Sequence, residues 1–93
     1  MANSDDNGRL TASELSAAAL TTVYELTGYQ PEAVTAFEWD GEYWRITVDA
    51  LELERVPNTT DVLGEYEIRL DGEGNLHGYK RTRRFVRGQP SEA

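Results

Sequence analysis

The chain has 93 residues, a net charge of -8, 39% hydrophobic residues and no cysteine. A chain of this length can bury one hydrophobic core but not two, so we expect a single domain. The lack of cysteine excludes disulfides and thiolate metal sites, and the acidic charge argues against nucleic acid or an anionic membrane as a partner of the whole surface. No apolar run approaches the roughly 20 residues that span a bilayer, and the first residues are polar, so we expect a cytoplasmic protein.

The first structural signal along the chain is a helix that is predicted to begin at Thr11. Thr11 and Glu14 have the spacing of a capping box, and Leu10 can pack on Leu15 as a hydrophobic staple. Gly28 is a suitable residue at which to end the helix. One stripe of the helical wheel is predicted to face the core: Leu15, Ala19, Thr22, Val23 and Leu26.

Two further apolar residues of this helix lie away from the stripe. Leu20 and Tyr24 are one helical turn apart. They form either the margin of the core or an exposed patch. Outside the predicted domain, residues 1–9 and 89–93 lack apolar periodicity, which indicates disordered tails on either side of a domain at 10–88.

After the helix the hydrophobic period changes to two, which is typical of strands. Asp40 and Gly41 form a predicted tight turn between two alternating segments, so we expect a β-hairpin. The phase of the alternation shifts after Val48, which predicts a β-bulge near Ala50. Leu51 and Leu53 would then be buried, with Glu52 and Glu54 outside. The alternating residues are Thr35, Phe37 and Trp39 in the first strand and Trp44, Ile46 and Val48 in the second.

Two more strands are predicted after a long loop at residues 55–63. Tyr66, Ile68 and Leu70 occupy one face of the third strand, and a glycine-rich turn at 71–75 leads into the fourth. The predicted fold is therefore α+β, with one N-terminal helix packed on a four-stranded antiparallel β-meander.

No constellation of residues suggests catalysis or a cofactor. His77 is the only histidine, so a histidine-based metal site or a nucleophile-base pair cannot be completed. The segment from Asp71 resembles the opening of a calcium loop, but Leu76 and Thr82 stand where the loop requires glycine and glutamate, which favours a simple turn. We therefore expect a protein that binds other macromolecules and is not an enzyme.

Charge is segregated between the last two strands. Five of the nine basic residues lie between positions 80 and 87, after an acidic strand. If the two strands pair through the turn, Glu67 should face Lys80, and Glu65 should reach Arg81 or Arg84.

The basic strand permits two interpretations. Arg83, Arg84 and Arg87 are expected to outnumber the nearby acids and so to form a docking patch for an acidic protein or RNA, or else they form an ordinary solvated face. Tyr79 and Phe85 lie between them and could stack on bases, so a regulatory module that binds RNA or DNA is the alternative function. The net charge of -8 opposes that alternative.

Several short motifs lie between Glu52 and Arg87: Arg55-Val56-Pro57, Asp61-Val62-Leu63, Tyr66-Glu67, Leu70-Asp71 with Gly74, and Tyr79 with Arg81, Arg84, Phe85 and Arg87. Together with the upstream helix and hairpin, so over about residues 10–88, this pattern resembles the gas vesicle protein O family. The resemblance implies an accessory protein of gas vesicle formation, without catalytic residues, that binds the shell protein or other accessory proteins and is cytoplasmic or associated with vesicles. An unpaired edge strand would also allow homodimerisation. The candidate binding residues are Arg81, Arg83, Arg84, Arg87, Tyr79, Phe85, Leu20 and Tyr24.

Overall fold

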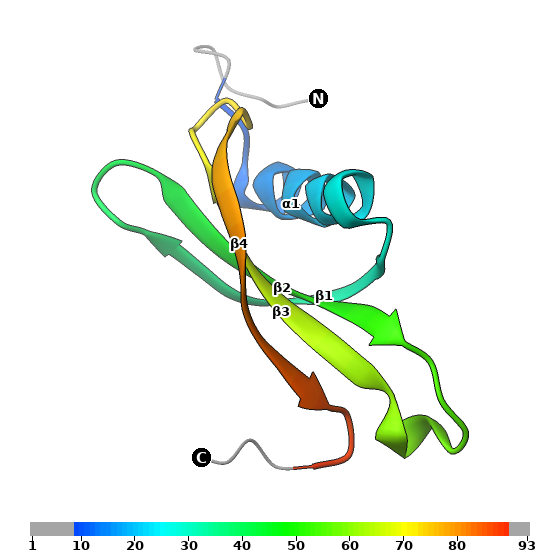
Figure 1. The fold of residues 1–93 in the computed structure, drawn as a ribbon. Helices are drawn as coiled ribbons and strands as arrows, with labels where there is room; N and C mark the ends of the chain where they lie inside the picture. Colours follow the sequence, from blue (N-terminus) through cyan, green and yellow to red (C-terminus); the bar gives the residue numbers. More distant parts are fainter. Residues whose placement is uncertain (1–8, 90–93) are drawn as a thin grey trace.

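The computed structural model describes residues 9–89 and contains one helix followed by a four-stranded sheet (Figure 1). The sheet is antiparallel throughout, in the order β1-β2-β3-β4. The predicted α+β class and meander are confirmed, whereas most of the predicted tails lies outside the described residues. The elements are α1 (Ala12–Thr27), β1 (Gln30–Trp39), β2 (Trp44–Leu53), the short 3-10 helix η1 (Asn58–Thr60), β3 (Val62–Leu70) and β4 (Leu76–Val86).

Local sequence signals set both ends of α1, as predicted. The hydroxyl of Thr11 accepts the backbone N–H of Glu14 at 3.1 Å, and the carboxylate of Glu14 accepts the backbone N–H of Thr11 at 2.8 Å. Gly28 ends the helix in the left-handed region with φ of 79°, which glycine adopts without steric cost. Leu10 packs against the core cluster that contains Leu15.

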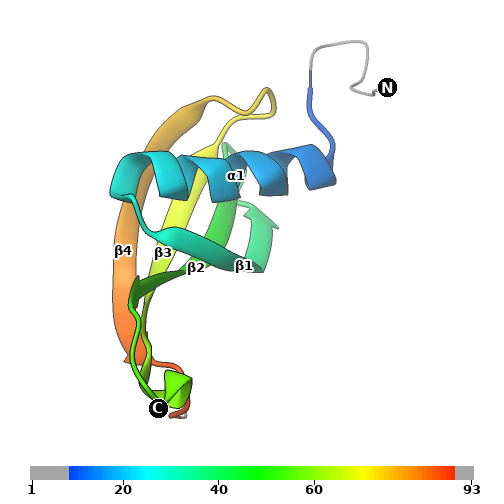
Figure 2. The same cartoon turned by 90° about the vertical axis from the view of Figure 1, so that its right-hand side faces the viewer.

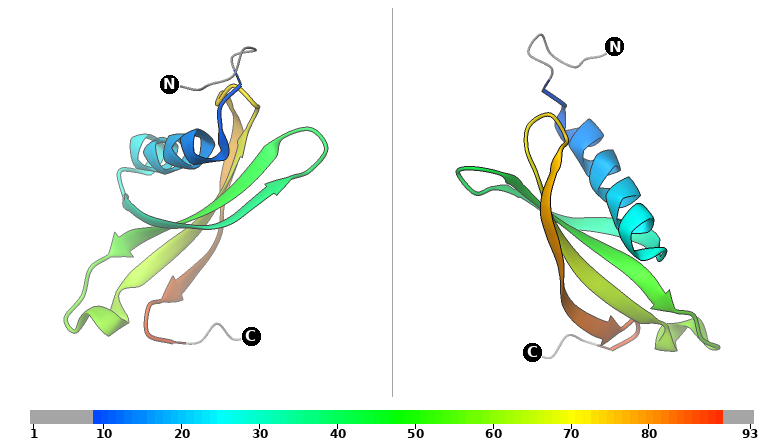
Figure 3. Two further views of the ribbon diagram at one scale, coloured as in Figure 1. Left: turned by 180° about the vertical axis from the view of Figure 1, so that it is seen from behind. Right: turned by 45° about the horizontal axis from the view of Figure 1, so that its top comes forward.

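The helix lies across one face of a strongly twisted sheet, and the strands extend well beyond it (Figures 2 and 3). It packs on β1, β2 and β3. The C-terminal part of β2, the N-terminal part of β3 and the C-terminal part of β4 project past the helix (Figures 1 and 2). On the side of the sheet that carries α1, this projecting part is therefore not covered by the helix.

The core lies between α1 and the sheet. Leu15, Ala19 and Val23 are buried as predicted, but Thr22 is only half-buried and Leu26 is 43% exposed. Leu15, Ala19 and Val23 are four residues apart, so each buried side chain is rotated by about 40° around the helix axis from the one before it. The next position in this series is residue 27, and the side chain of Leu26 points about 100° away from it. The prediction that Leu26 belongs to the core is wrong. The sheet residues of this core are Ile46, Val48, Ala50, Tyr66, Ile68 and Leu70.

The predicted hairpin between β1 and β2 is confirmed. One carboxylate oxygen of Asp40 accepts the backbone N–H groups of Glu42 and Tyr43 at 2.9 and 2.7 Å, and this lowers the pKa of Asp40. Gly41 provides the positive φ of 100° that the turn needs. The strand begins earlier than its alternation suggests, at Gln30, because the two register shifts in β1 interrupt the period of two.

The bulge in β2 lies two residues later than predicted. Ala50 stays on the core face and pairs regularly, and the register shift falls between Leu51 and Leu53. The predicted placement of the next residues is therefore reversed, because the side chain of Glu52 is only 5% exposed whereas Leu53 is 43% exposed. Glu54 is exposed, as expected.

Candidate functional site

The candidate site lies on the helix side of the sheet, at the edge of the core where the sheet begins to extend past α1. One row of laterally paired residues crosses all four strands here, from Pro31 through Ala50 and Gly64 to Arg84. Laterally paired residues in a sheet share a face, so these four side chains lie on one surface. Ala50 and Gly64, in the middle of the row, leave space above the sheet for a neighbouring side chain.

That space is filled by Glu52. Its carboxylate accepts the hydroxyl of Tyr66 at 2.6 Å through Oε2, while Oε1 lies 3.3 Å from Nη1 of Arg81 and 3.1 Å from Nε of Arg84. A side chain at Gly64 would overlap Oε2 of Glu52, so the site requires glycine at this position. A buried carboxylate is stable only when it is paired and hydrogen-bonded, and these contacts meet that condition.

The electrostatics of this cluster leave an excess of positive charge. Burial, together with the hydrogen bond to Glu52, raises the pKa of Tyr66, so its hydroxyl remains a neutral donor. Two guanidinium groups therefore share one carboxylate. The side chains of Arg81 and Arg84, which we call the arginine pair, are 42% and 55% exposed. The cluster holds the pair in place while leaving it accessible.

A shallow hollow of about 310 Å³ lies between α1 and the start of β1 on the same side of the sheet. Leu20 is half-buried and packs against the core, whereas Tyr24 is 54% exposed. Leu20 therefore belongs to the margin of the core and Tyr24 to an exposed patch, and both residues line the hollow. Its lining consists of Leu20, Thr21, Tyr24, Gln30 and Pro31.

The other face of the sheet carries ion pairs between β3 and β4. Lys80 pairs with Glu67 at 3.7 Å, which confirms that prediction. Glu65 contacts neither Arg81 nor Arg84, however, and instead binds Nε of Arg83 at 2.9 Å. The reason is a bulge at Thr82, because Tyr66 is paired with Arg81 whereas its neighbour Glu65 is paired with Arg83. Arg83 therefore lies on the same face as Glu65, and Arg81 and Arg84 lie on the opposite face.

Arg83 and Arg87 are engaged within the fold. The guanidinium of Arg83 also lies 4.4 Å from the centre of the half-buried Phe85 ring. Arg87 makes two hydrogen bonds to Glu32, at 3.0 and 2.8 Å, and one to the buried Asp61 at 3.1 Å. These bonds, with Glu32 the larger contributor, raise the pKa of Arg87. The prediction that Arg83, Arg84 and Arg87 outnumber the nearby acids is wrong.

The turn before β4 is stabilised by Asp71, as expected for a turn. Its carboxylate binds the ring of His77 at 2.9 Å and accepts the backbone N–H groups of Glu73 and Asn75, which holds the pKa of Asp71 well below its usual range. The ring of His77 stacks on Tyr43 at 4.6 Å. Within residues 9–89, no group of three histidine or carboxylate side chains is placed to hold a metal ion.

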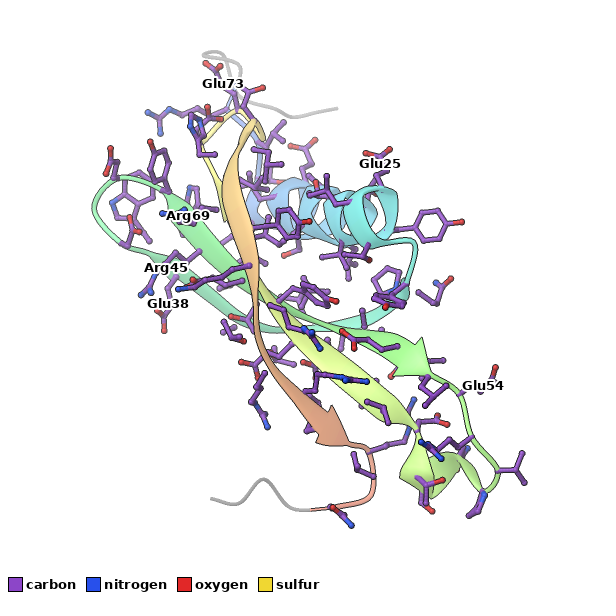
Figure 4. All side chains as sticks on the ribbon, viewed as in Figure 1. Glu25, Glu38, Arg45, Glu54, Arg69 and Glu73 are labelled. Atoms are coloured by element: carbon purple, nitrogen blue, oxygen red, sulfur yellow. The ribbon has the colours of Figure 1, made fainter. Side chains whose placement is uncertain are left out.

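At the opposite end of β1 and β2, Arg45 is surrounded by acidic side chains. It lies 3.1 Å from Glu38 and 3.2 Å from Glu67, and Figure 4 shows Glu38 beside it. Tyr79 is 43% exposed and is paired with Ile68, so it lies on the helix side of β4. The structure thus brings Tyr79 and the arginine pair to one face, and Arg83 and Phe85 to the other.

Sequence reasoning missed the acidic residues that organise the site. The alternation predicts that Glu52 lies on the solvated face, and it indicates no role for Gly64, Glu32 or Asp61. A signal for Glu52 was the break in alternation after Val48, which the sequence places only to within a few residues. Glu32 had no such signal, because its partner is 55 residues away in the chain.

Comparison with known proteins gives a consistent result. Residues 1–91 match the family described as "Gas vesicle synthesis protein GvpO". The chain is 45% identical over 71 residues to gas vesicle protein O of Streptomyces sp. (strain CB03234), which covers 76% of this chain and 56% of that protein. It is 37% identical over 82 residues to gas vesicle protein O1 of Halobacterium salinarum, covering 88% of this chain and 69% of the relative.

A third relative, gas vesicle protein O of Haloferax mediterranei, is 32% identical over 93 residues, which is 99% of this chain and 66% of the relative. The chain thus spans about half to two thirds of the length of the curated relatives that it matches. No solved structure matches it. In the part of the chain that the structure describes, α1 is too short and too polar to cross a membrane.

Proposed function

The chain belongs to the gas vesicle synthesis protein GvpO family, and from this membership we propose that it is a non-enzymatic accessory protein of gas vesicle assembly. In this proposal it acts in the cytoplasm, or on the vesicle surface, by binding the shell protein or other accessory proteins. Its partners are therefore proteins of the gas vesicle itself.

The observation that carries the binding role is the exposed arginine pair. Arg81 and Arg84 are held by the buried carboxylate of Glu52 but point two charges toward solvent on a protein of net charge -8. Oriented guanidinium groups favour recognition of carboxylates, and complementary charge gives specificity and fast association. A surface of this kind suits a protein that binds and releases subunits.

The alternative function, binding of RNA or DNA, receives less support from the geometry. Lys80, Arg83 and Arg87 are paired with acids of the same chain, and Phe85 is half-buried beside Arg83. A strand that binds nucleic acid needs exposed aromatic faces next to uncommitted cations. In β4, the exposed aromatic and basic side chains that meet this requirement are Tyr79 and the arginine pair.

The test is a pull-down of the tagged chain from cells that express a complete gas vesicle gene cluster. Washes at low and high salt separate electrostatic binding from apolar binding, since screening weakens contacts between exposed charges. We expect gas vesicle proteins in the eluate and their partial loss at high salt. Recovery of nucleic acid alone, or of neither class, would contradict the proposal.

A further inference from the structure

We propose that the arginine pair and the hollow between α1 and β1 together form a docking site for an acidic segment of a partner protein. In this site an apolar side chain of the partner occupies the hollow, and carboxylates of the same segment bind Arg81 and Arg84. The inference rests on the proposed function and specifies which surface is used and the chemistry that it recognises.

The arginine pair retains most of its hydrogen-bonding capacity. A guanidinium carries five N–H donors, and a carboxylate can accept two of them side by side. Among residues 9–89, the polar contacts of the pair run to Glu52 alone, through Nη1 of Arg81 and Nε of Arg84. The other edge of each guanidinium is thus available to a second carboxylate.

Four other basic side chains on or next to the sheet, Arg45, Lys80, Arg83 and Arg87, differ in this respect. Arg45 lies within 4 Å of three carboxylates, and Arg87 contacts two. Lys80 and Arg83 each have a carboxylate of β3. Glu67 is also shared, by Lys80 and Arg45, but Arg45 contacts Glu38 and Asp40 as well. Within residues 9–89, Arg81 and Arg84 have no carboxylate within 4 Å other than the one that they share, so an acidic partner can add charge pairing here.

The hollow and the pair are close enough for one segment to reach both. Pro31 lines the hollow, and it is separated from Arg84 by two intervening strands in the row that crosses the sheet. With about 4.8 Å between neighbouring strands, the separation is about 14 Å. An extended segment of about four residues, or a helix of about three turns, covers this distance.

The chemistry favours an acidic protein segment over a second copy or a polyanion. In a two-fold dimer across this site, the arginine pairs of the two copies would approach each other, and like charges destabilise such a contact. A nucleic acid would be repelled by the net charge of -8 and would leave the apolar lining of the hollow without a partner. A segment with both carboxylates and an apolar side chain matches both parts.

Photo-crosslinking from position 24 tests the inference directly. A photoreactive amino acid replaces Tyr24 in the full chain, in cells that express a complete gas vesicle gene cluster. Replacement of Glu25 is the matched control, because Glu25 is also exposed in the same helical turn but points away from the sheet (Figure 4). We expect crosslinks from position 24 to map to a segment of another gas vesicle protein that carries acidic and apolar residues, with far fewer from position 25.

Two sets of variants test the charge requirement. Arg81→Gln with Arg84→Gln should reduce crosslinking about tenfold or more, which corresponds to about 1.4 kcal/mol. Lys80→Gln with Arg83→Gln removes the same charge from β4 and should have less than about a twofold effect. The first pair of changes also alters the surroundings of Glu52, so a substitution away from the arginines is needed to test charge alone. Thr21→Glu in the exposed lining of the hollow should reduce crosslinking, whereas Thr21→Lys should preserve it.

The outcomes separate this inference from the proposed function. If gas vesicle proteins are recovered but the crosslinks form equally from positions 24 and 25, or map to a segment without acids, a second copy or a nucleic acid, the docking site is wrong and the proposed function stands. Equal effects of Thr21→Glu and Thr21→Lys would also overturn the docking site. Failure to recover gas vesicle proteins by any route would overturn the proposed function as well.

Discussion

Substitution of Gly64 by alanine should destabilise the protein through clashes with two side chains, of which Glu52 is the closer. A Cβ atom at this position would lie 2.7 Å from Cδ of Glu52, still closer to Oε2, and 2.9 Å from Cε1 of Tyr66. The backbone of Gly64 is not in the left-handed region, so the cost arises from crowding and not from φ. The carboxylate must move, and its hydrogen bond from the Tyr66 hydroxyl is weakened.

The expected cost follows from these contacts. Overpacking of a buried site costs about 1–3 kcal/mol, and loss of a hydrogen bond to a charged group costs about 1.5–3 kcal/mol if it is complete. The half-exposed arginines contribute little, since exposed ion pairs contribute only about 0.2–1 kcal/mol each. We therefore expect Gly64→Ala to lower the free energy of unfolding by about 2–3 kcal/mol, or the melting temperature by about 10–20 °C.

Urea unfolding, followed by circular dichroism and the fluorescence of the two tryptophans, measures this free energy. The decisive experiment is a double-mutant cycle with Glu52→Ala, in which the cost of Gly64→Ala should fall by about 1 kcal/mol or more, because the closest clash is gone and only the contact with Tyr66 remains. Gly72→Ala is the control, since a Cβ there meets only the flexible side chain of Arg9, and it should cost less than about 0.5 kcal/mol. An equal cost of Gly64→Ala in both backgrounds would refute the assigned role of Glu52.

Three further tests concern other parts of the structure. Arg87→Met should lower the free energy of unfolding by about 1–3 kcal/mol in urea titrations, because it leaves the buried Asp61 without its cation. The control Arg83→Met should cost less than about 1 kcal/mol. The reverse order of the two costs would contradict the structural role of Arg87. The pKa of Asp71 is lower in the folded state, so the carboxylate stabilises the fold above its unfolded pKa of about 3.9, and this stabilisation is lost as the pH falls through the folded-state pKa. Asp71→Asn should therefore flatten the fall in the free energy of unfolding measured between about pH 4 and pH 2. Burial, followed by the charge of Glu65, raises the pKa of Asp49, so stability is lost as the pH rises through the folded-state pKa. Asp49→Asn should therefore increase thermal stability at pH 7, and this gain should vanish below about pH 4. A gain that persists at low pH would exclude the charge of Asp49 as its cause.

The sequence predicts the features that depend on neighbouring residues. The capping box of Thr11 and Glu14, the stop at Gly28 and the turn at Asp40 each involve contacts over at most three or four residues. The alternation in β3 likewise identifies the face that packs on the helix, because a period of two is preserved from Gly64 to Leu70. Local hydrogen bonds and periodicity therefore suffice for the element order and the fold class.

The candidate site depends on features that the sequence leaves open. A bulge shifts every later side chain of a strand to the other face, so an error of two residues in β2 exchanged the environments of Glu52 and Leu53. The bulge at Thr82 in the same way decided that Glu65 binds Arg83. The contact of Glu32 with Arg87 requires the curvature of the whole sheet, which no local pattern encodes.

We propose that the protein acts in gas vesicle assembly through the arginine pair. Complementation of a gas vesicle-forming strain that lacks its own copy tests it most directly, with vesicles counted by electron microscopy and the level of each variant measured. Arg81→Gln with Arg84→Gln should fail to restore vesicles although the protein accumulates in folded form, whereas Lys80→Gln with Arg83→Gln should restore them. Normal vesicle numbers with the first pair of changes, or equal loss with both, would contradict the claim.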